Sequence, residues 1–196
     1  MDDLLTVDVD KYDIDERDEA VNKLSLKYAL DGGKQYLDKL EEFLLYMKNI
    51  DHYSQDLRRA YAVQAYALAF DMVYNNLSKD SREKISDYLQ DHAAPLMRMD
   101  LYHDNNHRVV DAGALGVAGL VLNNQDYINT AIETFLHYFY DVNPKDGGSF
   151  EGHSYISFAL VESMPFMIGL KRANAYNLFT DPKALVTFEY LLETLS

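Results

Sequence analysis

Hydrophobic positions along this chain recur at helical spacing, and no segment alternates with the period of a β-strand. The clearest stripe has apolar side chains three and four positions apart, at Tyr36, Leu37, Leu40, Phe43, Leu44 and Met47. This spacing places them on one face of a helix. Residues 60–70 are instead apolar nearly all round, which predicts a helix that is buried on two sides.

Capping and helix-breaking residues divide the pattern into separate helices. Gly32 and Gly33 are expected to end a helix over 19–30. Ser54 or Asp56 should cap the next helix, and Ser78 the one over 80–92. Further boundaries are predicted at Pro95, at Asn123-Asn124 before a helix over 127–140, at the turn 143–148, at Pro165 as a kink within 154–172, and at Asp181-Pro182.

The stretch from Asp111 to Leu122 is rich in glycine and alanine, which predicts a helix that packs too closely on its neighbours for large side chains. Short turns between helices favour antiparallel hairpins. Successive hairpins without a strict sequence repeat suggest a toroid or solenoid more than a four-helix bundle. The expected fold is therefore all-α, as an incomplete (α/α) toroid of antiparallel helical hairpins.

Net charge changes the range of possible partners. The 196 residues carry a formal charge of −14, which argues against nonspecific binding to nucleic acid or to an anionic membrane. It also disfavours a polyanionic substrate, although local clusters act within roughly 8 to 10 Å and can outweigh it. The chain contains no cysteine, so it has no disulfides and gives no indication of its redox compartment.

The ends of the chain give further expectations. The acidic run over 8–19 is interpreted as a solvated entry segment, which divides the chain into residues 1–18 and a helical domain over 19–196. The last residues stop within a helical pattern, so a C-terminally truncated fragment is expected. No signal peptide or bilayer-spanning run is visible. The location is then secreted or periplasmic if a signal was removed, and otherwise cytoplasmic.

Two polar segments hold the candidate chemistry. Asn105, Asn106, His107 and Arg108 precede the small-residue run, and residues 146–155 form a glycine-rich loop that leads into a helix. The structural interpretation of the first segment is a helix cap. Two asparagines, a histidine and an arginine exceed what a cap requires, so a binding or catalytic role is the alternative.

The second segment offers Glu151, His153 and Tyr155. Glu151 is interpreted first as an acceptor for loop amides, with a general acid or a solvated charge as alternatives. Tyr155 starts a helix directly after the glycines, where its side chain can point into a cleft. His103 and His107 have the spacing of two metal ligands on a helix, but no glutamate follows the first histidine and the surrounding residues suggest a loop, so no metal and no cofactor is expected.

These segments resemble the heparinase II/III-like and alginate-lyase group of toroid lyases. Asn105-Asn106-His107 is similar to that group's Asn-His segment, and residues 146–155 to its "DG-x-x-x-EG-x-x-Y" stretch. Residues 67–78 and 28–37 resemble two of its helix ends, with Phe70 in place of the usual tyrosine. The resemblance extends over about residues 20–172.

The resemblance implies an enzyme that cleaves an anionic polysaccharide containing uronic acid by β-elimination. Asn106 and His107 would donate hydrogen bonds to the substrate carboxylate, and Tyr155 would be the base, the acid that protonates the leaving oxygen, or both. Beyond the resemblance, Asn105, Arg108, Glu151 and His153 lie in the same two segments and are expected to contribute to substrate binding. A tyrosine acts as a base more readily beside a cation, which Arg108 or His153 could supply. In full-length members a β-sandwich domain follows the toroid.

Two other functions remain open. A toroid glycoside hydrolase would use Glu151 with Asp111 or Asp146 as its carboxylate pair. A non-catalytic, carbohydrate-binding helical module would not bring Asn106, His107 and Tyr155 to one cleft. Asp111 also departs from the lyase pattern, because it would repel an anionic sugar if it faced the cleft.

Overall fold

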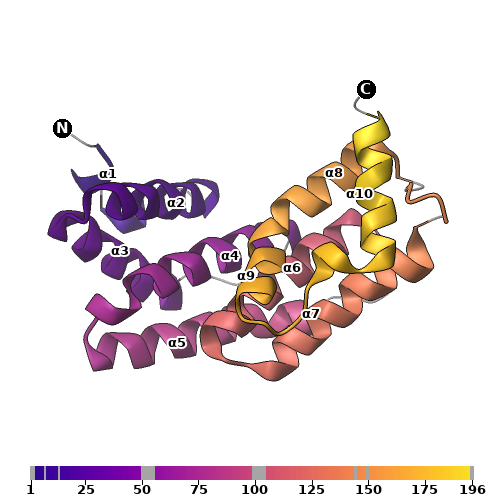
Figure 1. The fold of residues 1–196 in the computed structure, drawn as a ribbon. Coiled ribbons are helices and arrows are strands. Elements are labelled where there is room, and N and C mark those ends of the chain that lie inside the picture. Colours follow the sequence, from indigo (N-terminus) through magenta and orange to yellow (C-terminus); the bar gives the residue numbers. More distant parts are fainter. Residues whose placement is uncertain are drawn as a thin grey trace.

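The computed structural model describes residues 3–6, 8–12, 14–49, 56–98, 105–143, 145–148 and 151–194. All regular structure within these ranges is helical, with no strand (Figure 1). The all-α prediction is therefore confirmed. The helices are α1 Asp3–Thr6, α2 Ile14–Asp31, α3 Lys34–Tyr46, α4 Asp56–Val73, α5 Lys79–Ala93, α6 Asn106–Leu122, α7 Gln125–His137, α8 His153–Glu162, α9 Met164–Arg172 and α10 Pro182–Thr194.

Most helix ends lie where the sequence predicts them. Gly32 follows α2 with φ +62°, a conformation that glycine adopts without strain. The Oγ of Ser78 accepts a hydrogen bond from the N–H of Ser81 at 3.0 Å and caps α5. Asn123 ends α6 in the left-handed region, and Asp181 caps α10 by accepting from the N–H groups of Lys183 and Ala184. These predicted boundaries are confirmed.

Three features differ from the sequence analysis. Helix α2 begins at Ile14, so the division between residues 18 and 19 falls inside a helix, and Val9 in the preceding acidic run is buried. Pro165 accompanies a complete break at Ser163 instead of a kink, because it lies in the first turn of α9, where its missing N–H is tolerated. The helix predicted to reach residue 140 ends at His137, and the chain continues as a π-helical turn, Tyr138–Val142.

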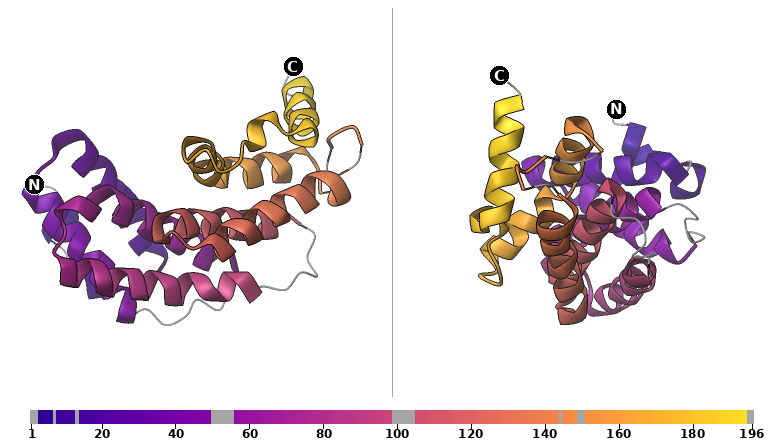
Figure 2. Two further views of the ribbon diagram at one scale, coloured as in Figure 1. Left: turned by 60° about the horizontal axis from the view of Figure 1, so that its bottom comes forward. Right: turned by 90° about the vertical axis from the view of Figure 1, so that its right-hand side faces the viewer.

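Successive helical hairpins along the chain pack against one another. Helices α2, α4, α6 and the α8–α9 pair contact one another successively, and we call them the central row. Helices α3, α5 and α7 are the second helices of the first three hairpins and pack against α2, α4 and α6 respectively. The hairpins follow one another from the N-terminal to the C-terminal end of the molecule (Figures 1 and 2).

The later helices of the central row are parallel and in register. Tyr61 of α4 interacts electrostatically with Asp111 of α6 and Glu162 of α8. Further along, Gly113, Gly116 and Leu120 of α6 lie against Ser163, Phe166 and Gly169 in turn, and Leu68 of α4 lines one cavity with Val117 and Pro165. Residue numbers therefore increase in the same direction along α4, α6 and the α8–α9 pair. As a consequence, α6 and α8 begin at the same edge of the row.

Close packing around α6 explains its small residues. Twelve of its residues are buried, among them Gly113 and Gly116. A Cβ at Gly113 would lie 2.8 Å from the Oγ of Ser163, and a Cβ at Gly116 would overlap the ring of Phe166. The prediction that this helix tolerates only small side chains at its contacts is confirmed. Helix α4 is also buried nearly all round over 60–70, except at Tyr61, Gln64 and Leu68.

Candidate functional site

The two predicted site segments meet at the edge where α6 and α8 begin. The backbone N–H of Asn106, the first residue of α6, donates a hydrogen bond to the Oε2 of Glu151 at 2.7 Å. Glu151 lies two residues before α8, and α6 and α8 pack against each other. Forty-five positions of sequence separate the two groups, so this contact is what brings the segments together.

The residues of the first segment differ in their access to solvent. Asn105 caps α6 through its Oδ1, which accepts from the N–H of Arg108 at 3.4 Å, so the cap interpretation is correct for this residue. Asn106 is only 3% exposed and is the least accessible of the three predicted catalytic residues. His107 and Arg108 are half-buried. A substrate at this edge would therefore meet His107 and Arg108 before Asn106.

On the α8 side, Tyr155 is 55% exposed and lies in the first turn of the helix. His153 begins the same helix and is half-buried, with its Nε2 enclosed and without a hydrogen-bond partner among the described residues. An imidazole nitrogen in this position can donate or accept a hydrogen bond without first giving up another contact.

Glu151 accepts from a backbone amide, and the amide at 2.7 Å is that of Asn106 at the start of α6. A carboxylate at the N-terminus of a helix is stabilised by the unpaired N–H groups and by the helix dipole. This contact competes with the use of Glu151 as one half of a hydrolytic carboxylate pair. Asp146, the other candidate in the loop, accepts from the N–H of Gly148 at 3.1 Å and holds the turn.

A second polar cluster lies one turn further along the central row, and sequence reasoning missed most of it. Tyr61 interacts with the carboxylates of Glu162, Asp111 and Asp18. Each member of this cluster, which we call the row cluster, comes from a different helix of the central row: α2, α4, α6 and α8. Asp111 is 6% exposed and also interacts with Arg59.

Burial dominates the electrostatics of the row cluster. It raises the pKa of Glu162, and it raises the pKa of Asp18 against the effect of hydrogen bonds from backbone N–H groups. Burial also raises the pKa of the Tyr61 phenol, and the three neighbouring carboxylates raise it further. The pKa of Arg59 is lowered by burial, which Asp111 opposes. The carboxyl groups of Glu162 and Asp18 thus hold their protons more firmly than exposed carboxyl groups do.

The row cluster and the predicted site share helix faces. His107 and Asp111 are four positions apart on α6, and Tyr155 and Glu162 are seven positions apart on α8. Both spacings return a side chain to the same face of a helix. The spacing of His107 and Asp111 is a signal that the sequence contains, whereas the approach of Asp18 and Tyr61 depends on the packing of separate helices.

Two cavities lined by described residues lie away from these side chains. One is bounded by α4, α6 and α9 at the far end of the central row, and another by α7, the π-helical turn, Tyr176 and Asp181. Neither is lined by His107 or Tyr155. His103, one of the two histidines with the spacing of metal ligands, lies outside the described residues. Within the ranges that the structure covers, no group of three or more histidine or carboxylate side chains is arranged to hold a metal ion.

Comparison with known proteins leaves the chain without an assigned family. No protein-family model matches it, and a search of curated proteins finds no relative. Among the described helices, none has the length and apolar character needed to cross a membrane.

Proposed function

We propose that this chain is part of an (α/α) toroid polysaccharide lyase that cleaves a uronic-acid-containing glycan by β-elimination. The observation that carries the proposal is the hydrogen bond between the N–H of Asn106 and Glu151, which holds the segment of His107 beside the segment of Tyr155. The parallel, in-register helices of the central row support a toroid, because successive hairpins of that fold repeat such an arrangement.

In the proposed reaction, a base removes the proton from the carbon next to the uronate carboxylate. The resulting charge spreads into that carboxylate, so hydrogen-bond donors placed there stabilise the transition state, by about 3 to 4 kcal/mol for a well-placed donor. His107 is the accessible donor, and the buried amide of Asn106 supports it from the same helix turn. Arg108 and His153 supply positive charge or donors near the anionic sugar.

Tyr155 is the residue proposed to move the proton. Its phenol is exposed at the start of α8, where a sugar chain can reach it. After the proton leaves the carbon, the glycosidic carbon–oxygen bond breaks and a double bond forms in the uronate ring. The leaving oxygen takes up a proton, which the same phenol can return. Proton transfer from a positioned group contributes about 10²- to 10⁴-fold to the rate.

The test is to incubate the purified chain with alginate, heparan sulfate, chondroitin sulfate and ulvan. Absorbance near the ultraviolet edge should rise as the unsaturated uronate forms, and this signal should be lost in Tyr155→Phe. Tyr74→Phe is the matched control. Tyr74 is also exposed, but it lies in the 3-10 turn Tyr74–Asn76 that follows α4, outside both site segments. Binding of oligouronates should be measured in parallel. A folded chain that neither turns over nor binds any of these glycans contradicts the proposal.

The row cluster favours one second candidate, a glycoside hydrolase. Such enzymes need one carboxylic acid that keeps its proton and one ionised carboxylate. Burial raises the pKa of Glu162, as the acid requires, and Asp111 interacts with the same tyrosine. Hydrolysis would release reducing ends without any ultraviolet signal, and Glu162→Gln would abolish it. The two candidate reactions are therefore distinguished by one pair of assays.

A further inference from the structure

A cavity of about 500 Å³ lies between α4, α6 and α9, far from the proposed lyase site. Its volume falls within the range of about 300 to 1,000 Å³ that is typical of small-molecule sites. The walls are mainly aliphatic, from Leu68, Val117, Leu120, Val121, Pro165 and Ile168. Leu68 and Ile168 are about 40% exposed, at 37% and 40%, although both are large and apolar. A ligand in the cavity would cover them.

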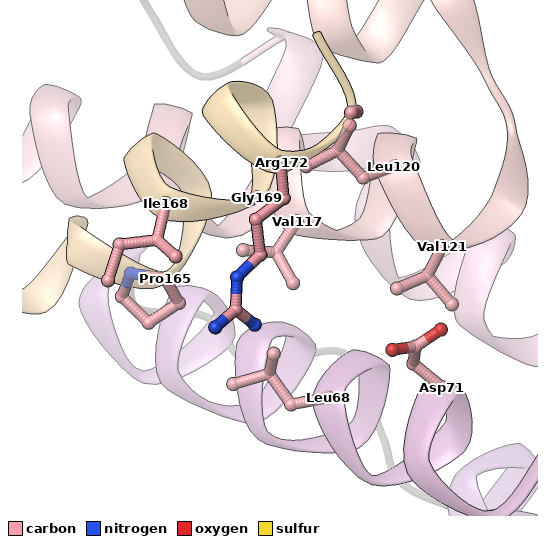
Figure 3. Close-up of a pocket in the computed structure, with 10 residues that line it drawn as sticks. Leu68, Asp71, Val117, Leu120, Val121, Pro165, Ile168, Gly169 and Arg172 are labelled. Atoms are coloured by element: carbon pink, nitrogen blue, oxygen red, sulfur yellow. The ribbon is translucent and has the colours of Figure 1, made fainter. Parts of the chain in front are cut away.

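Two charged side chains, Arg172 and Asp71, also line the cavity. Figure 3 shows the guanidinium of Arg172 reaching down from α9 toward Leu68, while the carboxylate of Asp71 lies beside Val121. The two groups do not pair with each other, and neither has an ion-pair partner among the described residues. The cavity therefore presents a cation and an anion that are separated by an aliphatic surface.

This chemistry does not suit a sugar. The lining has no aromatic ring on which a sugar ring can stack, and it has few hydrogen-bonding side chains. Val117 also lies ten residues after His107 on α6, roughly 15 Å along the helix at 1.5 Å per residue. The cavity is thus separate from the proposed glycan site and needs a ligand of its own.

Charge selects among apolar ligands. A simple monoanion would be attracted by Arg172 but opposed by Asp71 and by the net charge of −14. A simple cation would be attracted by Asp71 and opposed by Arg172. A molecule with both charges and an apolar body meets neither penalty. We propose that this cavity binds an apolar zwitterion, with its carboxylate on Arg172, its ammonium on Asp71 and its aliphatic part against Leu68, Val117 and Ile168.

Such a zwitterion could come from two sources, a free apolar amino acid or a short apolar peptide with free ends. Calorimetric titration of the whole chain with leucine and with leucyl-leucine separates them, since the source that fits should bind more tightly. Methyl NMR signals of Leu68, Val117 and Ile168 provide a second readout. Amidating the carboxylate or acetylating the amine of the better ligand should each raise Kd about fivefold or more.

Two variants test which side chain binds the carboxylate of the ligand and which binds its ammonium group. In Arg172→Gln, amidating the ligand's carboxylate should no longer change Kd, because the guanidinium that binds the carboxylate is gone. Acetylating the ligand's amine should still raise Kd. Asp71→Asn should have the opposite effect. Lys79→Gln and Asp126→Asn are controls with the same charge changes at exposed sites outside the cavity. Val121→Trp should fill the cavity and abolish binding, with circular dichroism showing that the helices remain.

Several results would overturn the proposal. One is the absence of saturable binding of both ligands by heat and by methyl shifts. Another is binding of heptanoate or hexylamine that is as tight as that of the zwitterion, because one of the two charges would then be irrelevant. Unchanged binding in a folded Val121→Trp variant would place the ligand elsewhere.

Discussion

Glu151 accepts a hydrogen bond from the backbone N–H of Asn106 at 2.7 Å, across 45 positions of sequence. This contact joins the loop before α8 to the first turn of α6. The carboxylate satisfies one of the N–H groups that every helix leaves without a partner in its first turn. Its charge also lies at the positive end of the helix dipole, which adds to the stabilisation.

Removing this acceptor should destabilise the fold. We expect Glu151→Ala to lower the free energy of unfolding by about 1 to 2 kcal/mol, as the loss of a charged cap does. Glu151→Gln should cost less, because the amide oxygen can still accept from Asn106. Urea denaturation measures both. Glu133→Ala, an exposed change on α7, is the control and should stay within about 0.5 kcal/mol. Equal stabilities of Glu151→Ala and the parent chain would contradict the role given to this contact.

Stability should depend on the ionisation of Glu162. Burial raises the pKa of this carboxyl above its ordinary value of 4.5, so the folded state favours the protonated form. The corresponding stabilisation is fully present below pH 4.5 and is lost as the pH rises through the raised pKa. Glu162→Gln should therefore be more stable than the parent at pH 7, and this gain should disappear on acidification.

The same reasoning applies to Asp18, whose pKa is also raised by burial. Asp18→Asn should raise the melting temperature at pH 7 more than at pH 4. Glu189→Gln, an exposed change of the same charge on α10, is the control for general charge effects. A gain in the Asp18 and Glu162 variants that does not vary with pH would show that burial of the charge is not its cause.

Packing of α6 against α9 should be sensitive to a single methyl group. A Cβ at Gly116 overlaps the ring of Phe166, so Gly116→Ala should cost about 1 to 3 kcal/mol through overpacking. Phe166→Leu makes room, and the double variant should be more stable than the sum of the single effects predicts. Thermal or urea unfolding of the four proteins in this cycle gives the coupling. Strict additivity would argue against direct contact.

Under the lyase proposal, two substitutions should reduce activity without unfolding the chain. His107→Ala should lower kcat about 10²- to 10³-fold, because one donor to the developing charge is lost. Tyr155→Phe should lower it about 10²- to 10⁴-fold, because no hydroxyl remains to move the proton. His137→Ala is the control histidine, since it lies on α7, outside the two site segments, and its Nδ1 pairs with Asp141. Formation of unsaturated product over time is the measurement.

Local chemistry made the helices predictable from the sequence. Ser78, Asn123 and Asp181 mark helix ends because capping depends on residues only a few positions away. The small residues of α6 correctly indicated close packing, although they could not name Phe166 or Ser163 as the neighbours. The start of α2 was misplaced because its acidic first turns look like solvated chain, whereas helix N-termini accept acidic residues well.

Tertiary contacts were less predictable. The residue types of the two segments and the resemblance predict one cleft for His107 and Tyr155, and the hydrogen bond of Glu151 with Asn106 is the contact that relates their segments. The row cluster draws one residue from each of four helices, and no sequence spacing joins Asp18 to Tyr61. The cavity with Arg172 and Asp71 likewise depends on the register of α4 with α9.

The break between α8 and α9 has a mechanical consequence. Gln64 donates a hydrogen bond to the carbonyl of Glu162 at 3.0 Å, and the hydroxyl of Ser163 donates to the carbonyl of Val109 at 3.1 Å. These two hydrogen bonds attach the break between α8 and α9 to α4 and to α6. A rocking motion of the segment that bears Tyr155 would therefore stop at the break, and the segment that bears Arg172 would stay still. A movement of α8 at the edge that bears Tyr155 therefore need not displace α9 at the cavity that Arg172 lines.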